Sequence, residues 1–265
     1  MLGAHHSGIA DAWQNDPLLW RRLYDPRVST AEGRRLIVSH VLADPPAAAS
    51  NTTFTYSNGN YILLGFIMEA LTDTSWEDLI ISRLFRPLNM TDCGFGNAQW
   101  PGSGTIDQPW PHKASLVGPI PIPPGRYADN PAAIGPAGTV HCSIESYAQF
   151  LQVHIDGFNG QPTKILSKGS FRMLHQGWPA KGPLEREYSS GGWNRDRVGC
   201  YPGTSLSHDG SNGMNYAKVV LLPERNAAVV AMTNVGGDDA EVATYETVCE
   251  AGTLASSEDG GMFVR

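Results

Sequence analysis

The stretch AKVVLLPERNAAVVAMTN, residues 217–234, constrains the fold of this 265-residue chain more than any other. Two runs rich in β-branched and small apolar residues flank the turn PERN, and this pattern indicates an antiparallel hairpin. Strand signals begin only after about residue 185, whereas the earlier part of the chain carries helix signals. Helices followed by strands and a closing helix predict a mostly helical region packed beside an antiparallel sheet.

The helix signals are capping residues and apolar residues at helical spacing. Ser29 and Glu32 form a capping-box pattern at the start of one helix. A second helix is expected over residues 59–72, with an apolar stripe made of Tyr61, Leu64, Ile67, Met68 and Leu71. Further helices are expected from Ser75 to Phe85, from Ser143 to Gly157, from Ser167 to Gln176 and over residues 238–254, the last with Val242, Tyr245, Val248 and Cys249 on one face.

These elements predict one mixed domain, α/β of the α+β kind, in which helices flank an antiparallel sheet. The helical region takes about residues 1–180, and the sheet with its closing helix takes about residues 185–265. Residues 100–137 are rich in Pro and Gly and show no periodicity. We expect them to form a long loop, and long loops in compact domains are often functional.

Composition excludes several classes of partner. The net charge of -7 is spread along the chain and no basic run appears, so nucleic acid is a poor partner. No apolar stretch reaches the roughly 18 residues that a membrane span needs, and no leader pattern opens the chain, so localisation is undetermined. The four cysteines form no Cys-X-X-Cys pair, which favours four free, mostly buried thiols. His5 and His6 lack a third ligand, so neither a metal nor another cofactor is expected.

Two short motifs carry chemistry. Tyr56-Ser57-Asn58 precedes the helix over residues 59–72, where a phenol could move protons if a nearby cation lowered its pKa from about 10. His208 and Gly210 lie at the end of an expected strand, where glycine lets a ligand approach and the Ser211 N–H could donate to an oxyanion. Each motif also has a structural interpretation: Tyr56 as a core aromatic, Asn58 as an N-cap, His208 as a turn residue.

The two motifs and the segments around them follow one another along the chain in the order that is typical of one family. FTYSNGNYILLGFIMEALTDTSWEDLIISRLFRPLNMTDCGFG resembles the Tyr-X-Asn region of the serine β-lactamase and penicillin-binding-protein superfamily, in the branch with class C β-lactamases, D-aminopeptidases and family VIII esterases. HHSGI resembles its His-Thr-Ser-Gly-Leu segment, and IGPAGTVHCSIESYAQFL resembles its Pro-Ala-Gly-Gly turn and following helix. SHDGSNGMNYAKVVLLPERNAAVVAMTN resembles its His-X-Gly strand and hairpin. The resemblance covers nearly the whole chain.

The resemblance implies covalent catalysis by a serine of a Ser-X-X-Lys motif, which attacks a small ester or amide. It makes Tyr56 the general base or acid, and Asn58 a ligand of the substrate or of the lysine. His208 and Gly210 would line the strand side, and the Ser211 N–H would form half of the oxyanion hole. A histidine in the place of lysine favours an esterase over a β-lactamase, because histidine is mostly neutral at pH 7.

The chain departs from this family in one respect: no serine is followed by lysine three residues later. The sequence therefore resembles the C-terminal portion of a longer protein, without the nucleophile, its central helix and the first strands of the sheet. Loss of that helix is expected to uncover several hundred Å² of apolar surface. At about 25 cal/mol per Å², the free energy lost is comparable to the whole net stability of a domain. Ser7 and Ser57 are poor substitutes, because neither has a lysine partner.

Three hypotheses follow. The chain is a partial serine hydrolase whose complete form cleaves small esters, β-lactams or D-amino-acid amides. Alternatively, it is a pseudoenzyme or small-molecule-binding protein that keeps the cleft, or one half of a two-chain hydrolase. For the chain alone, a partner chain, a second copy or a rearranged segment is expected to cover the exposed core. The DNA directly upstream of Met1 distinguishes these hypotheses.

Overall fold

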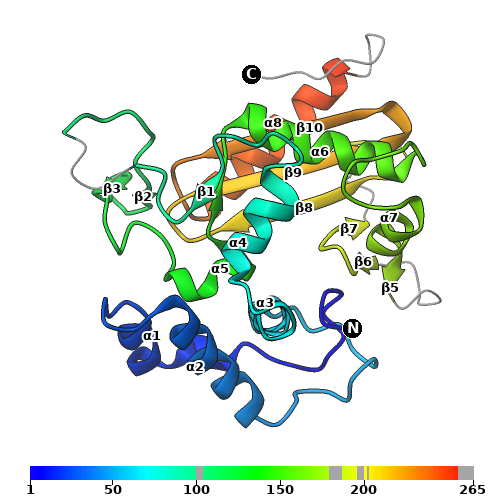
Figure 1. Cartoon of the computed structure of the whole chain (residues 1–265). Helices are drawn as coiled ribbons and strands as arrows, with labels where there is room; N and C mark the ends of the chain where they lie inside the picture. The colour runs from blue at the N-terminus through cyan, green and yellow to red at the C-terminus, as the bar shows by residue number, and fades with distance from the viewer. Residues whose placement is uncertain (100–103, 179–186, 196–199, 202, 256–265) are drawn as a thin grey trace.

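The computed structural model describes residues 1–265 except 100–103, 179–186, 196–199, 202 and 256–265. Figure 1 shows a layer of helices from the early part of the chain beside a sheet from its later part. The elements are η1 (Ala12–Asn15), α1 (Pro17–Leu23), α2 (Thr30–Ala43), α3 (Asn58–Thr72), α4 (Trp76–Ile80), η2 (Ile81–Phe85), β1 (Gly94–Phe95), β2 (His112–Lys113), β3 (Ile120–Pro121), η3 (Ala132–Ile134), α5 (Gly135–Gly138), β4 (Val140–His141), α6 (Ile144–Phe158), α7 (Lys168–His175), β5 (Gly177–Trp178), β6 (Glu187–Ser189), β7 (Asn194–Arg195), β8 (Leu206–Ser211), β9 (Tyr216–Leu222), η4 (Pro223–Arg225), β10 (Ala227–Thr233) and α8 (Asp238–Ala255).

The main sheet of the described residues has the order β10-β9-β8-β7-β6-β5, and every pair in it is antiparallel. The predicted hairpin is confirmed: β9 and β10 pair from Tyr216↔Thr233 to Leu222↔Ala227. Between the two strands, η4 and the left-handed Asn226 (φ 51°) reverse the chain. Asparagine tolerates this conformation better than most residues, which explains its place in the turn.

Successive side chains of a strand point to opposite faces. In β9, the side chains on both faces are covered by other elements. Val219 and Leu221 pack in a cluster with Leu151 and Ile155 of α6. Val220 and Leu222 pack in another cluster with Val248 of α8. Figure 1 shows α6 and α8 lying along the β9–β10 hairpin. The near-continuous apolar run of β9 is therefore the signature of a strand buried on two sides.

The helices begin where their caps predicted. Ser29, Ser75, Ser143 and Ser167 each accept a hydrogen bond from the backbone N–H three residues later, at the starts of α2, α4, α6 and α7. The apolar core of the helical layer joins α1, α2, α3 and η3 around Ile37 and Ile62, which are both fully buried. No helix of the described residues is both long and apolar enough to cross a membrane.

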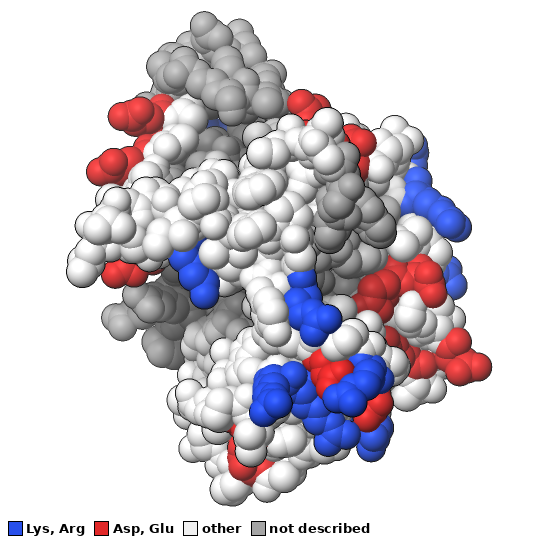
Figure 2. Space-filling model, turned by 90° about the vertical axis from the view of Figure 1, so that its left-hand side faces the viewer, with Lys and Arg blue, Asp and Glu red and all other residues white. Residues whose placement is uncertain are grey.

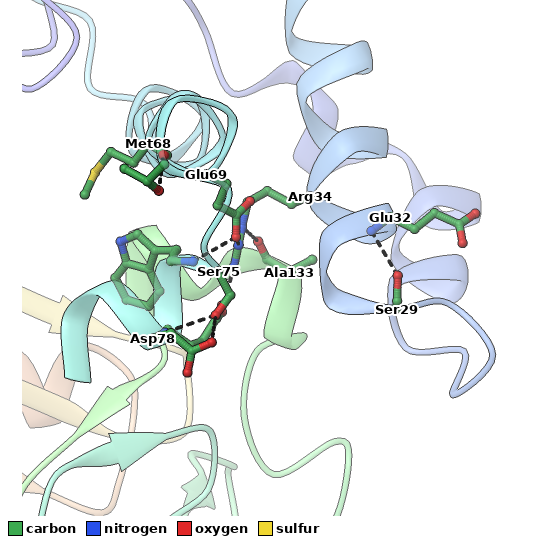
Figure 3. Close-up of polar contacts among 11 residues, drawn as sticks. Ser29, Glu32, Arg34, Met68, Glu69, Ser75, Asp78 and Ala133 are labelled. Carbon is green, nitrogen blue, oxygen red and sulfur yellow. Dashed lines mark hydrogen bonds and ion pairs between the residues drawn. The ribbon is translucent and has the colours of Figure 1, made fainter. Parts of the chain in front are cut away.

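A buried ion cluster ties three of these helices together (Figure 3). Arg34 of α2 is fully buried and bonds to Glu69 of α3 and, at 2.7 Å, to Glu77 of α4. Its Nε also donates to the carbonyl of Ala133 at 3.3 Å, and Glu69 accepts the backbone N–H of Trp76. The cluster therefore links α2, α3 and α4 through one buried guanidinium.

The outer face of the molecule carries mixed charge. Figure 2 shows Lys and Arg gathered at the helical end of the view, interspersed with Asp and Glu. Arg22 pairs with Glu32 at 3.3 Å and Arg27 with Asp25 at 2.6 Å. Each of these two arginines therefore lies beside a carboxylate.

The predicted apolar stripe of α3 lies largely on the outer side of the helix. Ile67 (38% exposed), Met68 (40%) and Leu71 (80%) face outward. The buried face instead carries Gly59, Ile62 and Gly65, and a Cβ at Gly65 would lie 2.3 Å from Pro136 Cγ. Close approach of α5 requires glycine there, so the contact face of α3 is small rather than bulky. The apolar face of α8 is likewise divided, since Val242 (55%) and Tyr245 (41%) are exposed and Val248 is buried.

The prediction of free thiols is wrong. Cys93 and Cys142 form one disulfide, and Cys200 and Cys249 form another. The first bridge continues the β1–β4 ladder, since Gly94 pairs with His141 and the cysteines stand one residue farther along. Each bridge joins residues 49 positions apart, a separation with no local sequence signature.

Candidate active site

Tyr56 and His208, which are far apart in the sequence, share one neighbour in the structure. The Tyr188 ring of β6 lies 6.4 Å from the Tyr56 ring, edge to face, and 6.3 Å from the His208 ring. The Tyr188 hydroxyl is 3.1 Å from His208 Nε2. The ring of His5 lies 4.2 Å from that of Tyr56 and 4.9 Å from that of Tyr188. These four residues form an aromatic cluster between the start of α3 and the sheet.

None of the purely structural interpretations fits the geometry. Tyr56 is 49% exposed and is therefore not a core aromatic. Ser57, and not Asn58, is the N-cap residue of α3. His208 lies within β8, opposite Val219 of β9, and not in a turn. The functional interpretation of the three residues remains a prediction, which the geometry permits.

The strand side of the site is the outer half of β8. β8 pairs with β9 along its whole length, whereas its pairing with β7 is limited to Ser207 and Asn194. From His208 to Ser211, therefore, β8 has no strand partner on the β7 side among the residues that the structure describes. A Cβ at Gly210 would meet nothing within 4 Å, so the backbone there faces open space. The close approach of a ligand that the sequence predicts at Gly210, and the role of the Ser211 N–H, stay predictions that this open edge permits.

The long loop meets the sheet directly after this edge. Asn212, which follows Ser211, donates from its side chain to Asp129 at 2.8 Å. The backbone N–H of His112 in β2 donates to the carbonyl of Met214 at 3.0 Å. The described part of the loop thus packs against the β8–β9 turn, next to the outer end of β8.

The Tyr-X-Asn turn is held by the N-terminal segment. The Asp11 carboxylate accepts the backbone N–H groups of Asn58 (2.6 Å) and Gly59 (2.9 Å) and the Ser57 hydroxyl (2.7 Å). His5 Nδ1 accepts the Ser57 N–H at 3.1 Å. Asp11 and Tyr188 were both missed at the level of the sequence, since no local pattern marks either residue.

The HHSG segment forms a second set of bonds to α3. Ser7 Oγ donates to Asn60 Oδ1 at 2.6 Å, and Asn60 Nδ2 is 3.2 Å from His5 Nδ1. Gly8 (φ 82°) packs so closely that a Cβ would lie 2.0 Å from the Ala48 carbonyl oxygen. The segment therefore serves as a support for α3, and both serines considered as substitute nucleophiles, Ser7 and the fully buried Ser57, are engaged in it.

The electrostatics of the cluster favour uncharged imidazoles and a protonated phenol. Burial lowers the pKa of His5 to about 4, and burial also lowers the pKa of His208. Although the Tyr56 side chain partly reaches solvent, the partial burial of its phenol, followed by the negative charges of Asp11 and Asp209, raises the pKa of Tyr56. The cation expected to activate Tyr56 is therefore not supplied by the described residues, since Lys218 pairs with Asp209 at 2.7 Å.

The described residues contain no cluster of three or more His, Cys, Asp or Glu side chains that could hold a metal ion. His5 turns its Nδ1 to the start of α3, as described above, and not to a shared ligand with His6. The side chains of the aromatic cluster offer hydrogen bonding and proton transfer by two phenols and two imidazoles.

Comparisons with known proteins find similarity over most of the chain. A family model described as Beta-lactamase matches residues 1–250. Penicillin-binding protein 4 of Amycolatopsis lactamdurans is 26% identical over 195 residues, which are 70% of this chain and 48% of that protein. The chain therefore spans about half the length of this curated relative.

Solved structures show the same fold at low sequence identity. D-amino acid amidase from Ochrobactrum anthropi SV3 matches with a TM-score of 0.71 and 20% identity, over 97% of this chain and 71% of that one. The octameric penicillin-binding protein homologue from Pyrococcus abyssi matches with a TM-score of 0.70 and 20% identity, over 98% of this chain and 55% of that one.

Proposed function

The chain belongs to the Beta-lactamase family, and from that premise we propose that it supplies two walls of an acyl-transfer pocket for small esters or amides. One wall is Tyr56 with Asn58, and the other is His208 with Gly210 and Ser211. The observation that carries the proposal is the shared contact with Tyr188, which brings the two motifs together across the chain. The serine nucleophile and its lysine would come from a segment outside these residues.

In the proposed reaction, the serine oxygen bonds to the substrate carbonyl carbon and its proton passes to the lysine–Tyr56 pair. The Ser211 N–H stabilises the oxyanion as one of two backbone donors. The bond to the leaving alcohol or amine then breaks, and that group takes the proton from Tyr56. Water next hydrolyses the acyl-serine by the same steps in reverse order. The raised pKa of Tyr56 suits the proton-donating step, and an incoming lysine ammonium would lower that pKa for the other.

We propose an ester or a neutral amide as the substrate in preference to a β-lactam. Burial lowers the pKa of His208, so this position carries no fixed positive charge for a substrate carboxylate at pH 7. The solved relatives include a D-amino acid amidase and a D-stereospecific amidohydrolase, which supports a small amide as the alternative.

A second candidate is a binding protein or one half of a two-chain hydrolase. The exposed apolar residues of α3, with Leu71 at 80% exposure, favour a covering chain over a free surface. A relative is described as octameric, which supports a second copy as one such chain. In this version the cleft binds the ester or amide, and turnover needs the serine of the partner.

The test compares this chain with any longer product, encoded in frame or by a neighbouring gene, that carries Ser-X-X-Lys. The chain alone should show no acylation burst with a chromogenic ester or a cephalosporin and no labelling by a fluorophosphonate. The complete product should be labelled at its Ser-X-X-Lys serine, and Tyr56→Phe should lower ester turnover at least 100-fold. Tyr127→Phe, at a tyrosine that is 64% exposed, is the matched control and should have no effect.

A charge variant tests the substrate class. His208→Lys in the complete product should raise cephalosporin turnover relative to ester turnover, because it restores a fixed cation. Stoichiometric labelling of this chain alone, at any of its own serines, would refute the proposed division of the site.

A further inference from the structure

The start of α3 takes its caps from a segment about 50 residues earlier in the chain. A helix leaves its first backbone N–H groups without partners inside the helix. Here the Ser57 N–H bonds to His5, and the Asn58 and Gly59 N–H groups bond to Asp11. The Ser57 hydroxyl, which would ordinarily accept from the helix, donates to Asp11 instead. The local sequence of α3 therefore does not cap the helix by itself.

The Asp11 carboxylate is itself held rigidly. Trp13 Nε1 donates to Oδ1 at 3.0 Å, and Gln14 Nε2 donates to Oδ2 at 2.7 Å. Together with the three donors of the turn, five hydrogen bonds converge on one carboxylate. Charge-assisted bonds of this kind are about twice as strong as neutral ones, and an anion at a helix N-terminus also gains from the helix dipole.

The hydrogen bonds of Asp11 are made at Asn58 and directly next to Tyr56, the two residues that form one wall of the proposed pocket. Asn58 carries one of the bonded N–H groups, and Tyr56 is joined directly to the bonded Ser57. The negative charge of Asp11 also acts on the Tyr56 phenol, where it adds to the effect of burial. A change at Asp11 should consequently alter Tyr56 in a way that loss of an ordinary helix cap would not.

We propose that Asp11 is a positioning residue of the pocket: its carboxylate latches the start of α3 and thereby sets Tyr56 and Asn58 opposite His208. The inference rests on the proposed function for its meaning in catalysis. The latch itself needs neither nucleophile nor substrate, so it can be tested in this chain alone.

The test is Asp11→Asn, followed by NMR of the chain labelled at the tyrosine Cζ carbons, with Tyr56 assigned through Tyr56→Phe. Removal of the anion should lower the pKa of Tyr56. Hydrogen exchange at the Asn58 and Gly59 amides should accelerate about five- to tenfold, as expected for a lost cap. A Tyr56 midpoint that stays unchanged in folded Asp11→Asn protein would overturn the inference.

Asp16→Asn is the matched control. Asp16 caps α1 by accepting the N–H groups of Leu18 and Leu19, so the variant makes the same chemical change at another helix. It should accelerate exchange at those two amides only and leave the pKa of Tyr56 unchanged. If both variants shift Tyr56 equally, Asp11 is an ordinary cap and the inference fails.

A measurement without mutation covers the case in which Asp11→Asn does not fold. In the unaltered chain, the amide nitrogens of Asn58 and Gly59 should each show an NMR scalar coupling across the hydrogen bond to the Asp11 carboxyl carbon. Absence of both couplings would refute the latch. If the couplings are present but Tyr56→Phe leaves the complete product fully active, the latch holds and the proposed function fails.

Discussion

Arg34→Met removes the positive charge at the centre of the ion cluster in Figure 3 while nearly preserving side-chain volume. The Arg34 side chain is fully buried, and the side chains of its partners Glu69 and Glu77 are 17% and 24% exposed. In the variant these two carboxylates face each other without a cation, and the carbonyl of Ala133 loses a donor. The perturbation therefore leaves buried charge uncompensated.

The expected loss in the free energy of unfolding follows from the burial of the Arg34 side chain. Removal of one partner of a buried ion pair typically destabilises a protein by about 3–5 kcal/mol. A whole domain is stable by only about 5–15 kcal/mol, so the variant should lose a large share of its stability. Arg22→Met is the matched control, because the Arg22–Glu32 pair is exposed (56% and 38%) and such pairs contribute about 0–1 kcal/mol.

Urea unfolding followed by circular dichroism measures the difference. With a dependence on urea of about 2–3 kcal/mol per M, Arg34→Met should lower the midpoint by about 1–2 M, and Arg22→Met should hardly move it. Adding Glu69→Gln and Glu77→Gln to Arg34→Met should recover part of the loss, because the stranded charges are then gone. Equal shifts for Arg34→Met and Arg22→Met would refute the reasoning.

Two further predictions concern the disulfides and the stability of the chain in acid. Non-reducing alkylation and mass spectrometry should find no free thiol, and Cys200→Ser with Cys249→Ser should cost about 4 kcal/mol by loop entropy; a reactive thiol in the folded chain would contradict the pairing. Burial lowers the pKa of His154 to about 3 and that of His175 to about 4, so the unfolded chain binds more protons and stability should fall as pH drops from about 6.5 to 4. His154→Gln should flatten that fall in thermal melts, and an unchanged slope would contradict it.

Much of the local structure could be predicted because its causes are local. Four of the helices start at serines whose hydroxyls accept a backbone N–H three residues later, a relation visible in the letters alone. The β9–β10 hairpin follows in the same way from two apolar runs and a turn residue that accepts a left-handed conformation. Each of these features depends on a few neighbouring residues.

Burial and pairing that depend on a distant part of the chain were harder to predict. The helical spacing of residues 59–72 gave the apolar stripe of α3 but not the face that packs, and α5 approaches the glycine face instead. The cysteine pairs are set by the β1–β4 register and by the docking of α8, neither of which their spacing reveals. In both cases the deciding contact comes from a distant part of the chain.

The candidate site shows the same difference between features with local causes and features that depend on distant contacts. The residue types of Tyr56-X-Asn58 and His208-X-Gly210, and their order, were determined by the sequence alone, because the chemistry of a phenol or an imidazole belongs to the residue itself. Only the tertiary structure decided that Tyr188 lies between the two motifs and that Asp11 holds one of them. Distances between side chains depend on how helices and strands pack, and packing is a property of the whole chain and not of any short stretch of it.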